Sequence, residues 1–450
     1  MRSITHVLRN FKLRWTEELE TAAIEQACRD AGMDWIESTL NPIVTIQLFF
    51  LQVLHGNTAI EHLPHLASMT FTAAAYCKAR IRLKLQVLRL LLERSVAQLQ
   101  QDVLDGSRWL GHRVFYVDGS SFSMPDTPEL QQYFGQPGQQ RPGCGFPVAH
   151  WLAMMHAGSG MITKMLASPL RTHDMSKTVH LHDELRAGDV LMADRAFCSF
   201  AHLVLLWQRG VHGLLRIHQR TIVDFASGRP HVDPRRGKSD RRSKGLPRSR
   251  WLRSLGVSDQ RVAWLKPANS SRPNWMSVEQ FAALPDWIVV RELRYTIHDK
   301  GFRPKEITLV TTLIDAEVYS FESLADLFRR RWEIETNFAH LKTTMKMDVL
   351  KCKTVNGVLK EMQMFALVYN SVRQVMLLAS VRQRVNVRRI SFISALRWLQ
   401  TTQLGESLCD LVVNPHRPNR LEPRVRKRRP KEYPLMKKPR WLLKQDLASK

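Results

Sequence analysis

Three acidic residues stand where carboxylates could do chemistry. Asp118 and Asp194 each end a short apolar run and precede a turn, in RVFYVDGSSF and DVLMADRAF. If these runs form neighbouring strands, both carboxylates project at the carboxyl edge of one sheet, where open sheets place their sites. Two carboxylates held close together repel each other unless a proton or a cation lies between them. A hard divalent cation such as Mg²⁺ takes oxygen ligands of this kind.

The third carboxylate, Glu335, belongs to the stretch LFRRRWEIETNFAHLK at 327–342. On a helix, the apolar residues of this stretch share one broad arc, and Arg331, Glu335 and Lys342 fall inside it. We expect the arc to be buried and a metal to neutralise the hidden acid, with the two cations facing an anion such as phosphate. Two metal ions roughly 3.5–4 Å apart can drive an in-line phosphodiester displacement. The pattern therefore predicts DNA strand cleavage or transfer.

The elements that must position these residues follow from apolar periodicity. The predicted fold class is α/β, a mixed sheet with helical cover, a β-rich insertion and a helical N-terminal domain. Asp118 should end a strand of about five residues, and Ser320 or Ser323 should cap the Glu335 helix. We expect five regions: 1–108 (helical N-terminal domain), 109–216 (core, first part), 217–314 (β-rich insertion with a basic arm at 229–250), 315–385 (core, second part) and 386–450 (basic C-terminal region, with little to pack after Pro415).

Charge points to the partner. The chain has 67 Lys and Arg against 41 Asp and Glu, a net charge of +26. Such an excess favours a polyanion through counterion release, and nucleic acid is the first candidate. No run of 18 apolar residues and no secretion signal is evident, so we expect a cytoplasmic protein and no membrane partner. The six cysteines form no C-x-x-C pair, which argues against a disulfide framework or a zinc knuckle.

The motifs resemble those of a known family. The spacing Phe328-x2-Arg331-x3-Glu335-x6-Lys342 resembles the Y-x2-R-x3-E-x6-K signature of bacterial insertion-sequence DDE transposases of the IS-four type. The segment Tyr116-Val-Asp118-Gly-Ser-Ser looks like that family's first acidic motif. The segment Met192-Ala-Asp194-Arg195-Ala-Phe197 looks like its second. Three motifs in order, over residues 105–380, make this resemblance specific.

The resemblance implies an RNase-H-like core and a triad of Asp118, Asp194 and Glu335 that holds two Mg²⁺ ions, with Mn²⁺ able to substitute. It implies Mg²⁺-dependent cleavage and strand transfer at the inverted-repeat ends of an insertion sequence, by cut-and-paste transposition. The partners would be the terminal inverted repeats, bound by the N-terminal helices, and target DNA. A homodimer in the DNA complex and a location on the bacterial nucleoid are implied too. The implied DNA-binding residues are Arg331, Lys342, Phe328 and Arg195.

Other interpretations remain open at this point. Phe328 replaces the signature Tyr and lacks its hydroxyl, which is compatible with an inactive transposase remnant that binds its ends and represses. A stand-alone metal nuclease for repair is a nearer alternative. Glu335 and Arg331 could form an ordinary i, i+4 ion pair, and Arg195 could only balance charge. A cluster of His173, Asp174, His180 and His182 invites a metal-site interpretation, but on a polar helix we expect these side chains at the surface.

Overall fold

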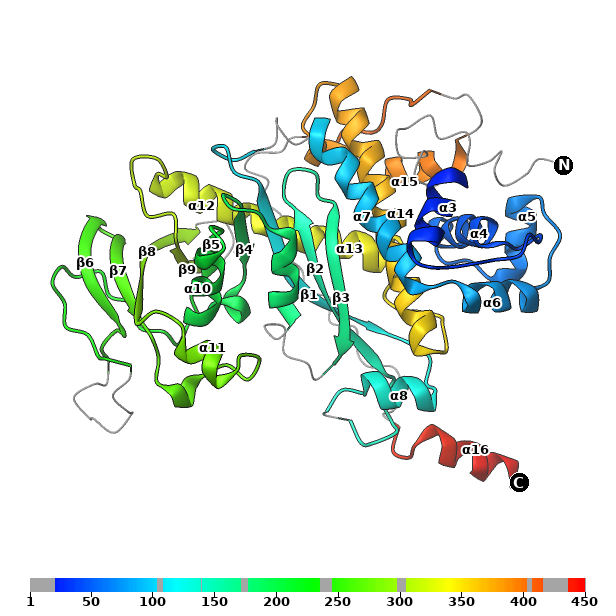
Figure 1. Ribbon diagram of the computed structural model, residues 1–450, viewed down its shortest axis with the longest axis horizontal. Coiled ribbons are helices and arrows are strands. Elements are labelled where there is room, and N and C mark those ends of the chain that lie inside the picture. The colour runs from blue at the N-terminus through cyan, green and yellow to red at the C-terminus, as the bar shows by residue number, and fades with distance from the viewer. Residues whose placement is uncertain are drawn as a thin grey trace.

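One mixed sheet runs through the middle of the molecule (Figure 1). The strands of the described residues form a nine-stranded sheet in the order β3-β2-β1-β4-β5-β9-β8-β7-β6. They are β1 (Val114–Ser123), β2 (Val148–His156), β3 (Ile162–Pro169), β4 (Val190–Ala193), β5 (His212–Arg216), β6 (Ser249–Gly256), β7 (Asp259–Leu265), β8 (Trp287–Ile297) and β9 (Lys305–Thr311). The structure is a computed structural model and describes residues 21–102, 108–138, 140–170, 177–234, 245–297, 305–402, 407–415 and 436–449.

The first five strands have the topology of an RNase-H-like core. Strand β1 pairs antiparallel with β2, and β2 pairs antiparallel with β3. On its other side β1 pairs parallel with β4, which pairs parallel with β5. The order is therefore 3-2-1-4-5, with β2 alone reversed. The start of β1 is a run of four buried residues, as expected for a strand covered on both faces. The predicted fold class, a mixed α/β sheet of this kind, is confirmed.

The β-rich segment continues the same sheet. Strand β9 pairs antiparallel with β5, in the register Leu215↔Val310, and β8, β7 and β6 follow in order. The predicted basic arm at 229–250 is only partly a loop. Arg229 is buried, and its guanidinium donates to the carbonyl and hydroxyl oxygens of Ser249, which begins β6. Residues 235–244 of the arm lie outside the described part of the chain.

Helices cover the right-hand part of the sheet in Figure 1. The N-terminal region is helical in its described part, and α7 packs against α14 and β3. Local signals set the helix ends: Asn41 caps α4 by accepting from the Val44 amide, and Pro42 occupies its first turn. The helices are α3 (Thr21–Asp30), α4 (Pro42–Leu54), α5 (Leu63–Ala67), α6 (Ala73–Arg82), α7 (Leu85–Asp102), α8 (Pro128–Phe134), α10 (Phe200–Gln208), α11 (Val278–Ala282), α14 (Val355–Arg382), α15 (Phe392–Thr401) and α16 (Arg440–Ala448), with short turns η1 (Ile60–His62), η3 (Val179–Glu184), η4 (Arg195–Phe197), η6 (Asn269–Ser271) and η9 (Val387–Arg389).

The long helix α14 (Val355–Arg382) is the central helix of the core. It is long and apolar enough to cross a membrane, yet 83% of its most apolar window is buried inside the fold. Its side chains share one hydrophobic cluster with α4, α7, β1 and β2. We therefore interpret α14 as a core helix, around which the N-terminal helices and the sheet pack.

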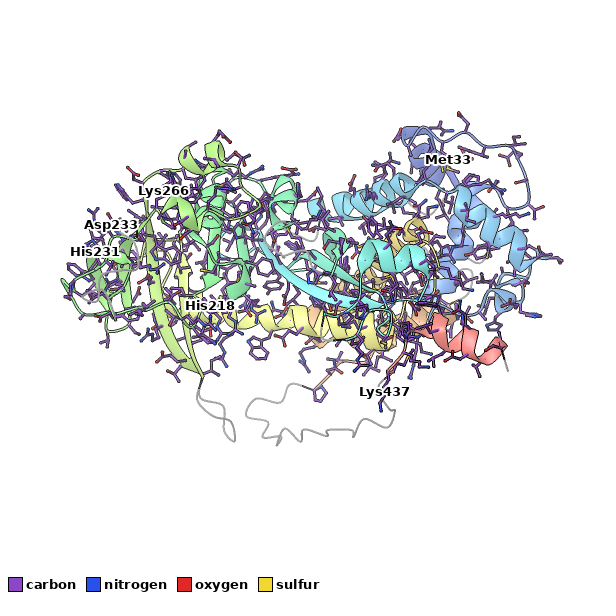
Figure 2. The ribbon with its side chains drawn as sticks, turned by 90° about the horizontal axis from the view of Figure 1, so that it is seen from below. Met33, His218, His231, Asp233, Lys266 and Lys437 are labelled. Carbon is purple, nitrogen blue, oxygen red and sulfur yellow. The ribbon has the colours of Figure 1, made fainter. Side chains whose placement is uncertain are left out.

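The helical stretch that carries Glu335 lies against β1. It comprises α12 (Phe321–Arg329), a turn η7 (Arg330–Trp332), α13 (Glu333–Ala339) and a π-turn η8 (His340–Thr344). Ser320 caps it by accepting from the amide of Ser323. The predicted apolar arc is buried, and each large apolar side chain removed from water contributes roughly 1.5–3 kcal/mol of stability. Figure 2 shows the stretch in yellow, running along the molecule beside the cyan strand β1.

The C-terminal region packs more than its composition suggests. Helix α15 buries Phe392 and Leu396 and contacts α14 and α4. Helix α16 lies beside α8 in Figure 1, and none of its residues is buried. An ion pair of 2.9 Å between Arg440 Nη1 and Asp126 Oδ2 joins it to the segment between β1 and β2. The described part of the tail after Pro415 therefore buries no α16 residue, as expected, whereas α15 precedes Pro415 and is not part of that expectation. Residues 416–435 lie outside the described part.

Candidate active site

Asp118 lies where β1 separates from β4. The parallel pairing of the two strands ends at Val117↔Ala193, whereas the pairing of β1 with β2 continues to Ser123↔Val148. The prediction that Asp118 ends a strand of about five residues is therefore wrong. The strand is ten residues long, because β2 keeps its backbone groups paired beyond the acid. Asp118 Oδ1 accepts a hydrogen bond of 2.8 Å from the amide of Gly119.

Asp194 follows β4 directly, at the position that matches Asp118 in the neighbouring strand. The two acids come one residue after the paired residues Val117 and Ala193, at the carboxyl edge of the sheet. One further strand extends this row. Leu215 of β5 pairs with Ala193, and the next residue, Arg216, places Nη1 3.6 Å from Asp194 Oδ1. That oxygen is buried and has no hydrogen-bond partner within the described residues.

Arg216 was missed in the sequence, although a signal was present. The run VHGLLRI ends in this cation just as the two earlier apolar runs end in acids. Three parallel strand ends thus carry an acid, an acid and a base in a row.

Arg331 links Glu335 to the sheet. Its Nη1 lies 3.6 Å from Asp118 Oδ2, and its Nη2 lies 3.6 Å from Glu335 Oε1. The side chain of Arg331 is only 6% exposed, whereas that of Glu335 is 51% exposed. The expectation that Glu335 is hidden is therefore wrong. The guanidinium occupies the buried position between helix and strand, because it can balance two carboxylates at once, and Glu335 lies at the open margin.

The donor set of the site fits a divalent cation. Asp118, Asp194 and Glu335 offer only carboxylate oxygens, the ligands that Mg²⁺ prefers. Asp194 also presents the buried, unbonded Oδ1. As the side chains stand, no group of three or more His, Cys, Asp or Glu side chains in the described ranges is arranged to hold a metal ion. Two arginines supply the positive charge beside the acids instead.

The remaining predicted residues fall into two groups. Lys342 lies against β1: its Nζ donates to Ser121 O at 3.0 Å and contacts Ser120 Oγ at 3.3 Å. Arg195 is partly exposed beside Asp194, and its guanidinium donates to Gln219 Oε1. Phe328, in contrast, is only 1% exposed. It presents no face to a DNA strand in this conformation, a correction that follows from its place on the apolar arc.

The far side of α13 is fixed by a second set of charges. Glu333 Oε1 lies 3.0 Å from Arg388 Nε, which joins the start of α13 to η9. Burial raises the pKa of Glu333, and the nearby arginines, Arg388 first, oppose that shift. Burial also raises the pKa of the Tyr116 hydroxyl, which is buried two residues before Asp118. The Glu333–Arg388 pair therefore fixes the start of α13 against η9 without using the three candidate acids.

A buried histidine pair lies behind the Asp194 turn. His182 and His202 stack with their Nε2 atoms 3.0 Å apart, and both are at most 1% exposed. His202 Nδ1 donates to the carbonyl of Phe197 in η4 at 2.7 Å. The expectation that His182 lies at the surface is wrong, because its partner comes from α10, far along the sequence. His180 is exposed as expected, and His173 and Asp174 lie outside the described residues.

Comparison with known proteins defines the class. The family described as the transposase DDE domain matches residues 109–371, more than half of the chain. The chain belongs to this family of DDE transposases.

Similar proteins indicate which branch of this family the chain resembles. It is 24% identical over 380 residues to the transposase InsG for insertion sequence element IS4 of Escherichia coli (strain K12), which covers 80% of this chain and 78% of the relative. It is also 31% identical over 106 residues to the putative transposase InsZ of the same organism, covering 23% of this chain and 34% of that protein. The expected resemblance to insertion-sequence transposases of the IS-four type is confirmed.

A solved structure is more distant. The piggyBac transposase in a synaptic complex with hairpin DNA is 10% identical, with a TM-score of 0.37, over 90% of this chain and 80% of that one. At this TM-score the likeness supports no conclusion about fold or function.

Proposed function

We propose that this transposase cleaves DNA at the inverted-repeat ends of its insertion sequence and joins those ends to target DNA, with Mg²⁺ or Mn²⁺ as cofactor. Asp118, Asp194 and Glu335 are the proposed catalytic acids. The observation that carries the proposal is the row at the carboxyl edge: Asp118 and Asp194 follow paired residues of β1 and β4, and Arg331 joins Glu335 to Asp118. A site for phosphodiester chemistry needs such a convergence of acids.

The residues divide the chemical work between them. Asp118, Asp194 and Glu335 would hold the metal ions, which supply an activated oxygen nucleophile and stabilise the leaving oxygen. Arg331 and Arg216 lie beside these acids, and Lys342 lies two positions further along β1. All three would balance the negative charge of the phosphodiester. Arginine is suited to this task, because its planar fork can bind two phosphate oxygens together. Arg195 is a further candidate contact to the DNA backbone.

Charge and family both support DNA as the partner. The net charge of +26 favours a polyanion, and the family acts in transposition. We extend this to two duplex partners, the terminal inverted repeats and the target, and to a homodimer that pairs the two ends. The N-terminal helices are the proposed binding region for the inverted repeats.

The test uses a supercoiled plasmid that carries the reading frame with its flanking DNA. Purified wild-type protein should nick this plasmid at the element ends in Mg²⁺ or Mn²⁺. The variants Asp118→Ala, Asp194→Ala and Glu335→Ala should each bind the end DNA but fail to nick it. Binding of Mn²⁺, followed by its electron paramagnetic resonance signal, should weaken in all three variants without reference to activity.

Three outcomes would contradict the proposal or a part of it. Binding of the ends without nicking by the wild-type protein would favour the inactive, repressing remnant. Nicking that ignores the end sequence would favour a stand-alone nuclease. Retained nicking in any one of the three alanine variants would remove that acid from the triad.

A further inference from the structure

Beyond Asp118, one face of β1 contacts the cationic side chains of the helical stretch that carries Glu335. Side chains of a strand alternate between its two faces, so Asp118, Ser120 and Phe122 share a face. Arg331 reaches Asp118 at this face. Lys342 reaches the next two positions, with Nζ 3.3 Å from Ser120 Oγ and 5.3 Å from the centre of the Phe122 ring. The two cations therefore contact three consecutive positions on one face of β1, at Asp118, Ser120 and Phe122.

The geometry draws the two cations together. From Arg331 to Lys342 is eleven residues, roughly 16 Å along a helix at 1.5 Å per residue. From Asp118 to Ser120 is two residues, roughly 7 Å along a strand. The long stem of Lys342 leans along the stretch and brings its ammonium to β1, two positions beyond Asp118. A flexible lysine needs acceptors at its tip to stay in such a position, because each of its four side-chain torsions is otherwise mobile.

Ser120 and the backbone of Ser121 supply these acceptors. The Lys342 ammonium has three N–H donors, and two acceptors are close, Ser120 Oγ and Ser121 O at 3.0 Å. One donor is left for an anion that approaches from the open side. The buried Phe122 ring beneath the ammonium adds a cation–π contact and closes the inner side.

We propose that Ser120 is a positioning residue, whose hydroxyl holds the Lys342 ammonium beside Asp118 so that it meets a DNA phosphate at the cleavage site. The inference rests on the proposed function and adds a residue to it. Ser120 acts through Lys342 and does not itself contact the reacting atoms. The hydroxyl is the part that matters, because Ser121 contributes only its carbonyl, which any residue keeps.

The experiment compares five variants in the plasmid nicking assay, including Lys342→Ala as the reference for a double variant. Ser120→Ala should lower the single-turnover nicking rate about three- to tenfold, the size expected for the loss of one hydrogen bond of ordinary strength. Ser120→Thr keeps a hydroxyl and should recover most of this loss. Ser121→Ala keeps the carbonyl that accepts from Lys342 and removes a side chain from the opposite face, so its loss should be clearly smaller than that of Ser120→Ala. The double variant Ser120→Ala, Lys342→Ala should equal Lys342→Ala within about twofold, because the serine has nothing left to hold.

Two further readouts separate positioning from a merely structural role. The melting temperature of Ser120→Ala should equal that of the wild type. The salt dependence of binding to a duplex that carries the inverted repeat should become shallower in Lys342→Ala by about 0.9 in the log–log slope, one phosphate contact, and by a smaller amount in Ser120→Ala. This binding measurement needs no cleavage, so it tests the inference even if the wild-type protein does not nick and the proposed function fails.

Three results would overturn the inference. The first is a Ser120→Ala variant with the wild-type salt slope and nicking rate. The second is an effect of Ser121→Ala as large as that of Ser120→Ala. The third is a full additional loss when Ser120→Ala is combined with Lys342→Ala, which would show that the serine acts independently of the lysine.

Discussion

Arginine and aspartate form a pair at each end of the paired region of β1 and β4, but the two pairs differ in distance and burial. At their amino ends, Arg113 and Asp189 directly precede the strands and form a buried pair, with Nε 2.8 Å from Oδ1 and side chains 8% and 4% exposed. Where the pairing of β1 with β4 ends, Arg331 lies 3.6 Å from Asp118, whose side chain is 25% exposed. The first pair is a close, desolvated hydrogen-bonded clamp. The second is beyond ordinary hydrogen-bond distance and partly hydrated.

The difference separates support from reactivity. Breaking a buried ion pair leaves an uncompensated charge in the protein interior and is costly. A longer, partly exposed pair contributes little, and water or another ion can replace either partner. Under the proposed function, the carboxylates at the site would exchange an arginine for a metal ion, while the clamp keeps the strands in register. The insertion has a second clamp of the first kind, Arg291 with Asp259 at 2.8 Å.

The variant Asp118→Asn should have the largest effect on activity and so tests the distinction between site pair and clamp most strongly. The amide keeps the shape of the side chain but loses the charge needed to hold a cation, so nicking should fall by roughly 10³- to 10⁴-fold. The melting temperature should stay unchanged, because the contact with Arg331 is loose. Plasmid nicking and thermal unfolding, measured on the same preparation, check both halves. A variant that unfolds at a clearly lower temperature would show that the site acid is also structural.

Asp189→Asn tests the opposite end of the same strands. It leaves Arg113 buried without its countercharge, and the free energy of unfolding should fall by about 3–5 kcal/mol. Urea denaturation gives the value. The matched control is Asp183→Asn, which removes an exposed pair with Arg209 and should change stability by less than about 1 kcal/mol. Equal effects of the two variants would contradict the distinction between clamp and surface pair.

Arg331→Gln sharpens the comparison at the site itself. The variant removes the shared countercharge of Asp118 and Glu335 and a proposed phosphate contact, so nicking should fall about 100-fold. Stability should change by only about 1 kcal/mol, because both carboxylates can be hydrated. Single-turnover nicking assays measure the loss of activity, and urea denaturation measures the change in stability. A loss of stability as large as that of Asp189→Asn would place Arg331 with the clamps.

Acid pH should weaken the scaffold by a smaller, graded amount. Burial lowers the pKa of His182 to about 3 and that of His202 to about 4. Between about pH 6.5 and these values the unfolded chain binds protons that the folded chain does not, so stability present at neutral pH is lost as the pH falls. The loss approaches roughly 1.4 kcal/mol per group for each pH unit.

Urea denaturation at about pH 7 and about pH 5.5 measures this slope. His182→Gln should flatten it, and the exposed control His180→Gln should leave it unchanged. A slope that is the same in all three proteins would show that the buried pair does not account for the acid sensitivity.

Much of the candidate site follows from the sequence, because its signals are local. An apolar run that ends in an acid reports a strand end, and helical periodicity places Arg331, Glu335 and Lys342 on one arc. The fold class follows from the same alternation of runs. The length of β1 does not, because it depends on a partner strand, β2, whose pairing with β1 continues to Ser123↔Val148.

The charge pairings were not predictable in the same way. Arg113 and Asp189 are 76 residues apart, and the sequence around either residue does not indicate that the other is its partner. The exposure of Glu335 depends on which residue of the arc takes the buried place, and this is decided by the approach of Asp118 to Arg331. His182 likewise meets His202 only after α10 has packed on the sheet. Propensity and spacing describe elements, whereas such pairs arise from their assembly.

The pairing of β5 with β9 limits which internal deletions the folded protein can tolerate. Because Leu215 and Val310 pair at the centre of the sheet, residues 217–314 are the neighbour that closes the β5 edge. A truncated copy without them would expose an apolar strand edge ready to pair with other chains. We expect such deletion derivatives to accumulate as insoluble protein in the cell, and not as smaller transposases or soluble repressors.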